Sequence, residues 1–330
     1  MENQYPYRAA HWVHDVCVID LNQTVWGRHS LILNLPATTI EVSGLSDRQA
    51  DVLKQAYTGF VIQNGEPEQC DTHCRALRLN HPLGISSEDL TRDGLYSPKI
   101  CRQTEYEFTL TGINFESVIR SDVSSTEATL AVASEEDLVL SGVFENFLRV
   151  LSSHQVLQKG GVALHSAGLV FSEQAYIFSG PSNAGKTTLT HKAHKKGARV
   201  LSDDINLVLP GKYENGCAYD AYAVPFTGEF GRTLDHAGGK DSYPVAGIIL
   251  LEQSNRLETH PVTPSMAVAR LLTGCPFVNT DEHESDALFN SVTGLVSKVP
   301  VIRLLSQRDD DIDDIMVAVK EQFKVEERVY

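Results

Sequence analysis

The chain has 330 residues, of which 42% are hydrophobic and 22% charged, an ordinary globular composition with room for two domains. Its net charge of −15 argues against nucleic acid or an anionic membrane as a partner held by bulk electrostatics. No segment approaches the ~20 apolar residues of a membrane helix, and the N-terminus lacks a signal-peptide pattern, so we expect a cytoplasmic protein that binds neither nucleic acid nor membrane.

Residues 1–150 predict a β-rich accessory domain of mixed α/β character. The ranges 13–21, 30–35, 105–113 and 128–133 have the apolar patterns of strands, and 46–57 has the pattern of a capped helix. The range 66–93 is polar and rich in turn residues, which predicts either a long loop or a small irregular subdomain. We expect this domain to recognise a substrate or to serve an accessory role.

The chain has six cysteines, and only Cys70 and Cys74 lie close together in sequence, with His73 between them. Their spacing is not Cys-x-x-Cys and no second ligand pair follows nearby, although Cys101 and His81 could contribute to a zinc site. We therefore favour a loop with two free thiols over a structural zinc site.

The range 135–151 predicts a helix with one apolar face, which we interpret as the hinge into a second domain, residues 151–330. The boundary is expected between 134 and 160. The next segment, 161–171, predicts a strand that contains His165. A single histidine in an apolar strand is usually a core residue, but this strand leads through a short turn into the one that precedes the motif described next, so His165 is also a candidate site residue.

The motif that carries the most chemistry is a phosphate-binding loop of the form GxxxxGK[ST]. A predicted strand, 175–179, precedes it, and a predicted helix, 188–196, follows it. In such a loop the backbone N–H groups surround phosphate oxygens, the lysine reaches the terminal phosphates, and the threonine hydroxyl ligates Mg²⁺. The sequence therefore predicts a site for ATP and Mg²⁺, formed by Gly180, Pro181, Ser182, Asn183, Ala184, Gly185, Lys186, Thr187 and Thr188.

Two adjacent carboxylates, Asp203 and Asp204, follow the next predicted strand, only 17 positions after Lys186. This compact spacing favours a small kinase core over a motor protein or a GTPase. Because adjacent strand residues point to opposite faces, we expect different roles for the two. One would hold Mg²⁺ or its water, and the other would take the proton from an acceptor hydroxyl. The alternative is a solvated acidic turn.

The range 224–240 is rich in glycine and predicts a mobile loop over the site. Arg232 and Lys240 within it are candidate cations for the charge of a transferred phosphate, although each could be an ordinary surface charge. Beyond this loop, 245–251 and 299–305 predict strands, and 264–273 and 307–323 predict helices. The acidic run 309–314 is explained by the dipole of the last helix rather than by a metal.

Together, Leu164-His165, the loop from Gly180 to Thr188 and Ser202-Asp203-Asp204 resemble the catalytic domain of HPr kinase/phosphorylase and related serine kinases. That family is similar in its core to phosphoenolpyruvate carboxykinase. The resemblance covers residues 150–320 and implies an α/β P-loop kinase core. It implies that Asp203 is the base, that Thr187 and Asp204 serve Mg²⁺, and that His165 lies close to the reacting centre.

The sequence departs from this family in two places. Its loop has Asn183 where the family usually has glycine, and asparagine tolerates the left-handed backbone next best. The family's second signature, associated with dephosphorylation, is not present in convincing form, which argues against phosphorylase activity and against HPr as the substrate.

We therefore expect an ATP- and Mg²⁺-dependent kinase that phosphorylates a hydroxyl, in serine of a peptide, in a protein or in free serine. Two alternatives stay open: a nucleotide-responsive binding or scaffold protein without transfer activity, and an enzyme like phosphoenolpyruvate carboxykinase. Retention of Lys186, His165 and both aspartates favours the kinase, because a binding protein needs no base. Homo-oligomerisation stays open, and we expect the Lys186 side chain to pack against little else.

Overall fold

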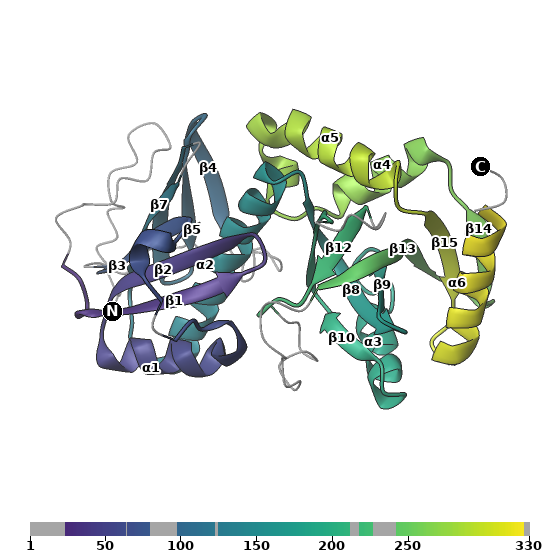
Figure 1. Ribbon diagram of the computed structural model, residues 1–330, viewed down its shortest axis with the longest axis horizontal. Coiled ribbons are helices and arrows are strands. Elements are labelled where there is room, and N and C mark those ends of the chain that lie inside the picture. The colour runs from purple at the N-terminus through teal and green to yellow at the C-terminus, as the bar shows by residue number, and fades with distance from the viewer. Residues whose placement is uncertain are drawn as a thin grey trace, which may run out of the picture. The chain divides into compact units, whose positions relative to one another are not determined.

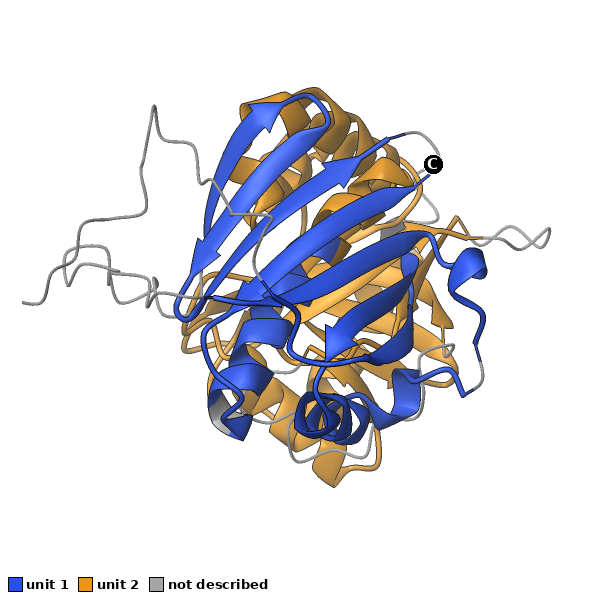
Figure 2. Cartoon of the chain, turned by 90° about the vertical axis from the view of Figure 1, so that its left-hand side faces the viewer, with its two compact units in different colours: residues 1–151 blue, residues 152–330 orange. Residues whose placement is uncertain are grey.

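The computed structural model describes residues 24–63, 65–79, 98–122, 125–211, 218–226 and 242–326. Within these ranges the chain is mixed α/β, with helix and strand in about equal amounts. It forms two compact units, residues 1–151 and 152–330, coloured blue and orange in Figure 2. Each unit is built around its own sheet (Figure 1).

Unit 1 contains a seven-stranded sheet in the order β1-β2-β3-β7-β6-β5-β4. The β2–β3 and β3–β7 pairs are parallel, and the other neighbours are antiparallel. Its regular elements are β1 (His29–Leu35), β2 (Thr38–Leu45), α1 (Asp47–Ala56), β3 (Thr72–Arg78), β4 (Lys99–Thr104), β5 (Glu107–Gly112), β6 (Phe115–Ser121), β7 (Thr126–Val132) and the first part of α2 (Asp137–Gln158).

The helix predicted over 46–57 is confirmed as α1, and its start has a clear cause. Ser46 is the N-cap: its hydroxyl accepts from the Gln49 N–H, and the Gln49 side chain accepts from the Ser46 N–H. This reciprocal capping box satisfies two backbone donors that the first helical turn leaves open. The strands predicted over 30–35, 105–113 and 128–133 are confirmed as β1, β5 and β7, and 13–21 lies outside the described residues.

The prediction of an irregular segment over 66–93 is wrong where β3 forms. Buried residues alternate at the start of this strand with more exposed ones, since Thr72, Cys74 and Ala76 are buried. The strand pairs in parallel with both β2 and β7. A central strand of this kind gains its stability from neighbours that are distant in sequence, which a local polarity pattern does not reveal. Cys74 therefore lies in a strand rather than in a loop.

The helix predicted over 135–151 continues to Gln158 as α2. Its extension carries four consecutive buried polar residues, Ser152, Ser153, His154 and Gln155. Polar residues are rarely buried in such a run.

Unit 2 contains an eight-stranded mixed sheet in the order β10-β8-β11-β12-β13-β15-β14, with β9 between β8 and β13. Among the described strands of this unit, only the β9–β13 and β13–β15 pairs are parallel. The elements are β8 (Val162–Phe171), β9 (Gln174–Ser179), α3 (Lys186–Lys195), β10 (Arg199–Ser202), β11 (Ile205–Pro210), β12 (Tyr219–Tyr222), β13 (Ser242–Gln253), β14 (Glu258–Pro261), α4 (Pro264–Thr273), α5 (Ser285–Val296), β15 (Val301–Ser306) and α6 (Ile312–Glu326).

Helices cover both faces of this sheet, because its central strands are apolar on both sides. Along β13, Ile248 and Leu250 pack into one hydrophobic cluster with residues of α4 and α5. The alternate residues, Ile249 and Leu251, pack into another with α3 and α6. The period of two in a strand thus divides the core into two layers (Figure 1).

The predicted elements of this unit are confirmed, with shifts at their ends. The helix over 264–273 matches α4, and the last helix begins at Ile312 rather than at 307. The helix predicted from 188 begins two residues earlier, at Lys186. In the described part of the chain, we find no helix with both the length and the apolar character needed to cross a membrane.

Candidate nucleotide site

The segment from Gly180 to Gly185 leaves the end of β9 and turns directly into α3. Two residues of the turn have left-handed backbone: Asn183, with φ of 66°, and Gly185, with φ of 104°. The expectation that Asn183 accommodates this conformation is confirmed. A side chain at Gly180 would approach the Leu251 carbonyl oxygen to 2.6 Å, so glycine is required there for the loop to lie against β13.

The loop conformation leads to a testable difference at residue 183. Asn183→Gly should retain the folding stability, because glycine adopts positive φ without strain, whereas Asn183→Val should lose about 1–2 kcal/mol. Denaturant unfolding of the full-length chain measures both values. Equal stabilities of the glycine and valine variants would contradict the assigned loop backbone.

Lys186 stands at the first position of α3 with only 7% of its surface exposed. Its ammonium donates hydrogen bonds to the carbonyl oxygens of Gly180, at 2.8 Å, and Pro181, at 3.1 Å. The expectation that this side chain packs against little else is therefore wrong. Burial lowers the pKa of Lys186, and the nearby Asp204 carboxylate opposes that shift. An anionic ligand in the loop would relieve the same penalty.

The two carboxylates Asp203 and Asp204 lie in a bend between β10 and β11 rather than on a strand. The bend is fixed by the buried Ser202 hydroxyl, which accepts from the N–H groups of Asp204, at 3.1 Å, and Ile205, at 3.2 Å, and donates to the Phe226 carbonyl at 2.8 Å. Asp203 is buried, whereas the Asp204 side chain is 20% exposed. Because they are not in a regular strand, both carboxylates line one cavity instead of facing opposite sides.

The strand pairing of β8 places His165 beside this bend. Ser166 pairs with Ser179 at the end of β9, and His165 pairs with Ile205 at the start of β11. The His165 Nδ1 lies 3.1 Å from Asp204 Oδ1, and 39% of the imidazole is exposed. His165 therefore lies beside Asp204 and is not a buried core residue.

A cavity of about 700 Å³ joins these groups. It is lined by the loop from Ser182 to Thr188 and by His165, Asp203 and Asp204. Its far wall comes from the ends of β13 and β15, at Gln253 and Ser306. The strands β9, β13 and β15 are parallel, so their carboxyl ends meet at one edge of the sheet, where α/β proteins commonly bind ligands.

A second cavity, of about 390 Å³, adjoins the start of the loop. It is lined by Gly180, Pro181 and Ser182, and it shares His165 and Ser182 with the first cavity. Glu252, at the end of β13, and Arg270, on α4, form an ion pair of 3.1 Å in its wall.

Arg232 and Lys240 lie outside the described residues. In the acidic run 309–314, Asp311 and Asp313 pair with Lys196, and Asp313 and Asp314 lie in the first turn of α6, where the dipole favours them.

The cysteines Cys70 and Cys74 are buried free thiols, and burial raises the pKa of both. Protonated thiols are poor metal ligands. His73 between them contacts Glu41 at 3.2 Å.

Sequence reasoning missed Asn206, which supports the bend, and Glu252 and Arg270, which line the second cavity. Asn206 is buried, and its amide donates to the Ser166 carbonyl at 2.7 Å and to the Ser166 hydroxyl at 2.9 Å. A polar residue inside an otherwise apolar strand was the available signal. Glu252 follows a predicted apolar strand, as Asp203 does, so the same rule of carboxylates at strand ends would have found it.

Residues 129–309 match a family model described as SynChlorMet cassette protein ScmC, which covers more than half of the chain. No curated protein matches the chain.

Proposed function

The chain belongs to the ScmC family, and we propose that it is an ATP- and Mg²⁺-dependent kinase, similar in mechanism to HPr-kinase-like serine kinases, that phosphorylates a hydroxyl group. The acceptor would be serine in a peptide, in a protein or as the free amino acid. The observation that carries the proposal is the convergence of Lys186, Asp203, Asp204 and His165 with the phosphate loop on one cavity. These residues supply a phosphate cradle, a cation and a base within a single site.

The proposal gives each residue the role that the resemblance to HPr-kinase-like serine kinases implies. The loop N–H groups and Lys186 would bind the phosphates of ATP. Thr187 and Asp204 would hold Mg²⁺, which supplies charge neutralisation when it is bound. Asp204 influences the pKa of Lys186, which supports its place on the phosphate side. The buried Asp203 would accept the proton of the attacking hydroxyl.

The second cavity is the proposed acceptor site, because it meets the nucleotide cavity at His165 and Ser182. Its Glu252–Arg270 pair would bind charged groups of the acceptor, such as the ammonium and carboxylate of an amino acid. A buried Lys186 pointing to the loop carbonyls of Gly180 and Pro181 places positive charge at the boundary of the two cavities.

The charged pair leads to a prediction about acceptor affinity. Arg270→Gln should raise the KM for a charged acceptor by about 10-fold, which corresponds to loss of one partly exposed charge-assisted hydrogen bond, and should leave the KM for ATP unchanged. Steady-state kinetics with both substrates varied measure the two values. Arg256→Gln is the matched control, because Arg256 is 75% exposed and pairs with Glu258. Equal acceptor KM values in the two variants would remove Arg270 from the acceptor site.

The transfer reaction itself is tested with γ-labelled ATP and Mg²⁺, incubated with the full-length protein and free serine, serine peptides or candidate protein acceptors. We expect label in an acid-stable phosphoester on one of these acceptors. Binding of Mg·ATP without transfer to any acceptor would favour a nucleotide-responsive binding protein. No binding of ATP would overturn both interpretations.

A further inference from the structure

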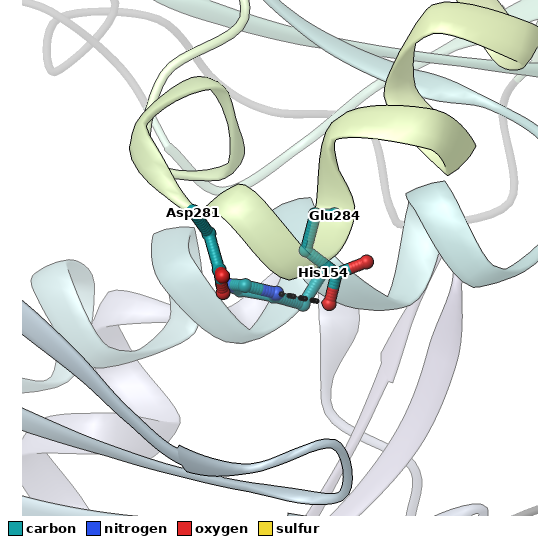
Figure 3. Close-up of side chains that lie close together, drawn as sticks. All are labelled: His154, Asp281 and Glu284. Carbon is teal, nitrogen blue, oxygen red and sulfur yellow. Dashed lines mark hydrogen bonds and ion pairs between the residues drawn. The ribbon is translucent and has the colours of Figure 1, made fainter.

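A group of metal-ligating side chains lies in unit 2, apart from both cavities. His154, on the last part of α2, meets Asp281, the N-cap of the short 3-10 turn Glu282–Glu284, and Glu284, the last residue of that turn. One ligand atom from each residue lies within 4.8 Å of the others, and Figure 3 shows the imidazole between the two carboxylates. We propose that these three residues bind a divalent transition-metal ion such as Zn²⁺.

The geometry of the group fits a metal ion better than a simple hydrogen bond. The His154 Nδ1 lies 3.4 Å from Glu284 Oε1, longer than the usual N–H···O separation of about 2.7–3.2 Å. Two ligands bound to one tetrahedral ion at about 2.1 Å are separated by about 3.4 Å, the edge of that tetrahedron. The observed separation therefore equals that of two ligands of one tetrahedral ion.

Burial and charge favour the same conclusion. His154 is 3% exposed, Asp281 is 8% exposed, and the Glu284 side chain is 17% exposed. Two carboxylates brought together in a buried place repel each other unless positive charge lies between them. A divalent ion bound by all three residues supplies positive charge at that place.

The backbone holds the carboxylates ready for such an ion. The Glu284 N–H donates to the Asp281 carbonyl at 3.0 Å, which closes the turn and sets the two side chains three residues apart on one side. The Asp281 Oδ1 accepts from the His283 N–H at 3.1 Å, which orients that carboxylate. Glu282 and His283, between them, are exposed.

The donor set identifies the class of metal. One imidazole nitrogen and two carboxylate oxygens suit Zn²⁺ or another first-row transition ion, whereas Mg²⁺ prefers oxygen ligands alone. Three protein ligands leave a coordination position for water. Because α2 and the turn before α5 are far apart in sequence, the ion would act as a staple within unit 2, independent of nucleotide.

The test is a Zn²⁺ titration of the full-length, chelator-stripped protein without nucleotide, in competition with a chromophoric chelator. We expect one bound equivalent that raises the melting temperature. Glu284→Gln and Asp281→Asn should each lower the Zn²⁺ affinity by about 100-fold or more. Loss of a residue that merely supports a metal ligand already lowers metal affinity by roughly 10- to 100-fold. Glu282→Gln, in the same turn but exposed, is the matched control and should bind as the unaltered protein does.

X-ray absorption of the Zn²⁺-loaded, unaltered protein identifies the atoms that coordinate the ion and does not depend on whether a variant folds. We expect a shell of nitrogen and oxygen only. A sulfur shell would place the ion on cysteines and overturn the proposal. Equal affinity of Glu284→Gln and Glu282→Gln, or no Zn²⁺ bound at micromolar concentration, would also overturn it and leave a buried ion pair of His154 with the carboxylates.

Discussion

Asp203→Asn is expected to lose phosphoryl transfer by about 100-fold or more, the scale of a positioned general base, while Mg·ATP affinity stays within a few-fold. The amide is nearly the same size as the carboxylate but does not accept the hydroxyl proton. Asp203 is buried in the bend that Ser202 fixes, so the substitution should leave the backbone in place. Single-turnover transfer with γ-labelled ATP measures the rate, and calorimetric titration measures the affinity.

Two comparisons make this result specific. Asp204→Asn should instead weaken Mg²⁺-dependent nucleotide binding, because it removes a charge from the proposed metal shell. Asp51→Asn, an exposed position on α1, should change neither value. If transfer stayed unchanged in both Asp203→Asn and Asp204→Asn, the carboxylate pair would be only an acidic turn, and the kinase proposal would fail.

Lys186→Met is expected to weaken ATP binding by at least about 100-fold, because the ammonium would make charge-assisted hydrogen bonds to phosphate, each worth roughly 1.5–3 kcal/mol. Methionine preserves the apolar stem of this buried side chain, whereas Lys186→Ala also removes the stem. We therefore expect both variants to lose ATP binding, and we expect Lys186→Met to stay closer than Lys186→Ala to the thermal stability of the unaltered protein. Calorimetric titration with Mg·ATP, together with thermal unfolding, checks the result.

The matched control for this change is Lys195→Met, which removes the same charge from an exposed position on the same helix. It should bind ATP with unaltered affinity. Retention of ATP binding in Lys186→Met would show that the loop does not hold the phosphates.

The local parts of the site could be predicted from the sequence because local chemistry determines them. Asn183 and Gly185 adopt the left-handed backbone that the turn requires. The helix α3 then begins at the next residue, Lys186. His165 follows from a hairpin, because β8 and β9 are joined by a short turn and pair antiparallel. In each case the residues involved are close in sequence.

The parts that were missed depend on contacts between distant segments. The bend at Asp203 requires the Ser202 hydroxyl and the Phe226 carbonyl, and Arg270 reaches Glu252 only after α4 packs on the sheet. His154 meets Glu284 across 130 positions of sequence. Such pairs arise from tertiary packing, so neither hydrophobic periodicity nor motif spacing predicts them.

The most direct test of the kinase proposal is the crystal structure of the full-length protein with Mg²⁺ and a non-hydrolysable ATP analogue. The proposal predicts the phosphates in the loop from Gly180 to Thr188, the metal ion on Thr187 and Asp204, and the γ-phosphate facing Asp203 and the second cavity. A nucleotide bound elsewhere, or one whose γ-phosphate points away from Asp203, would contradict it.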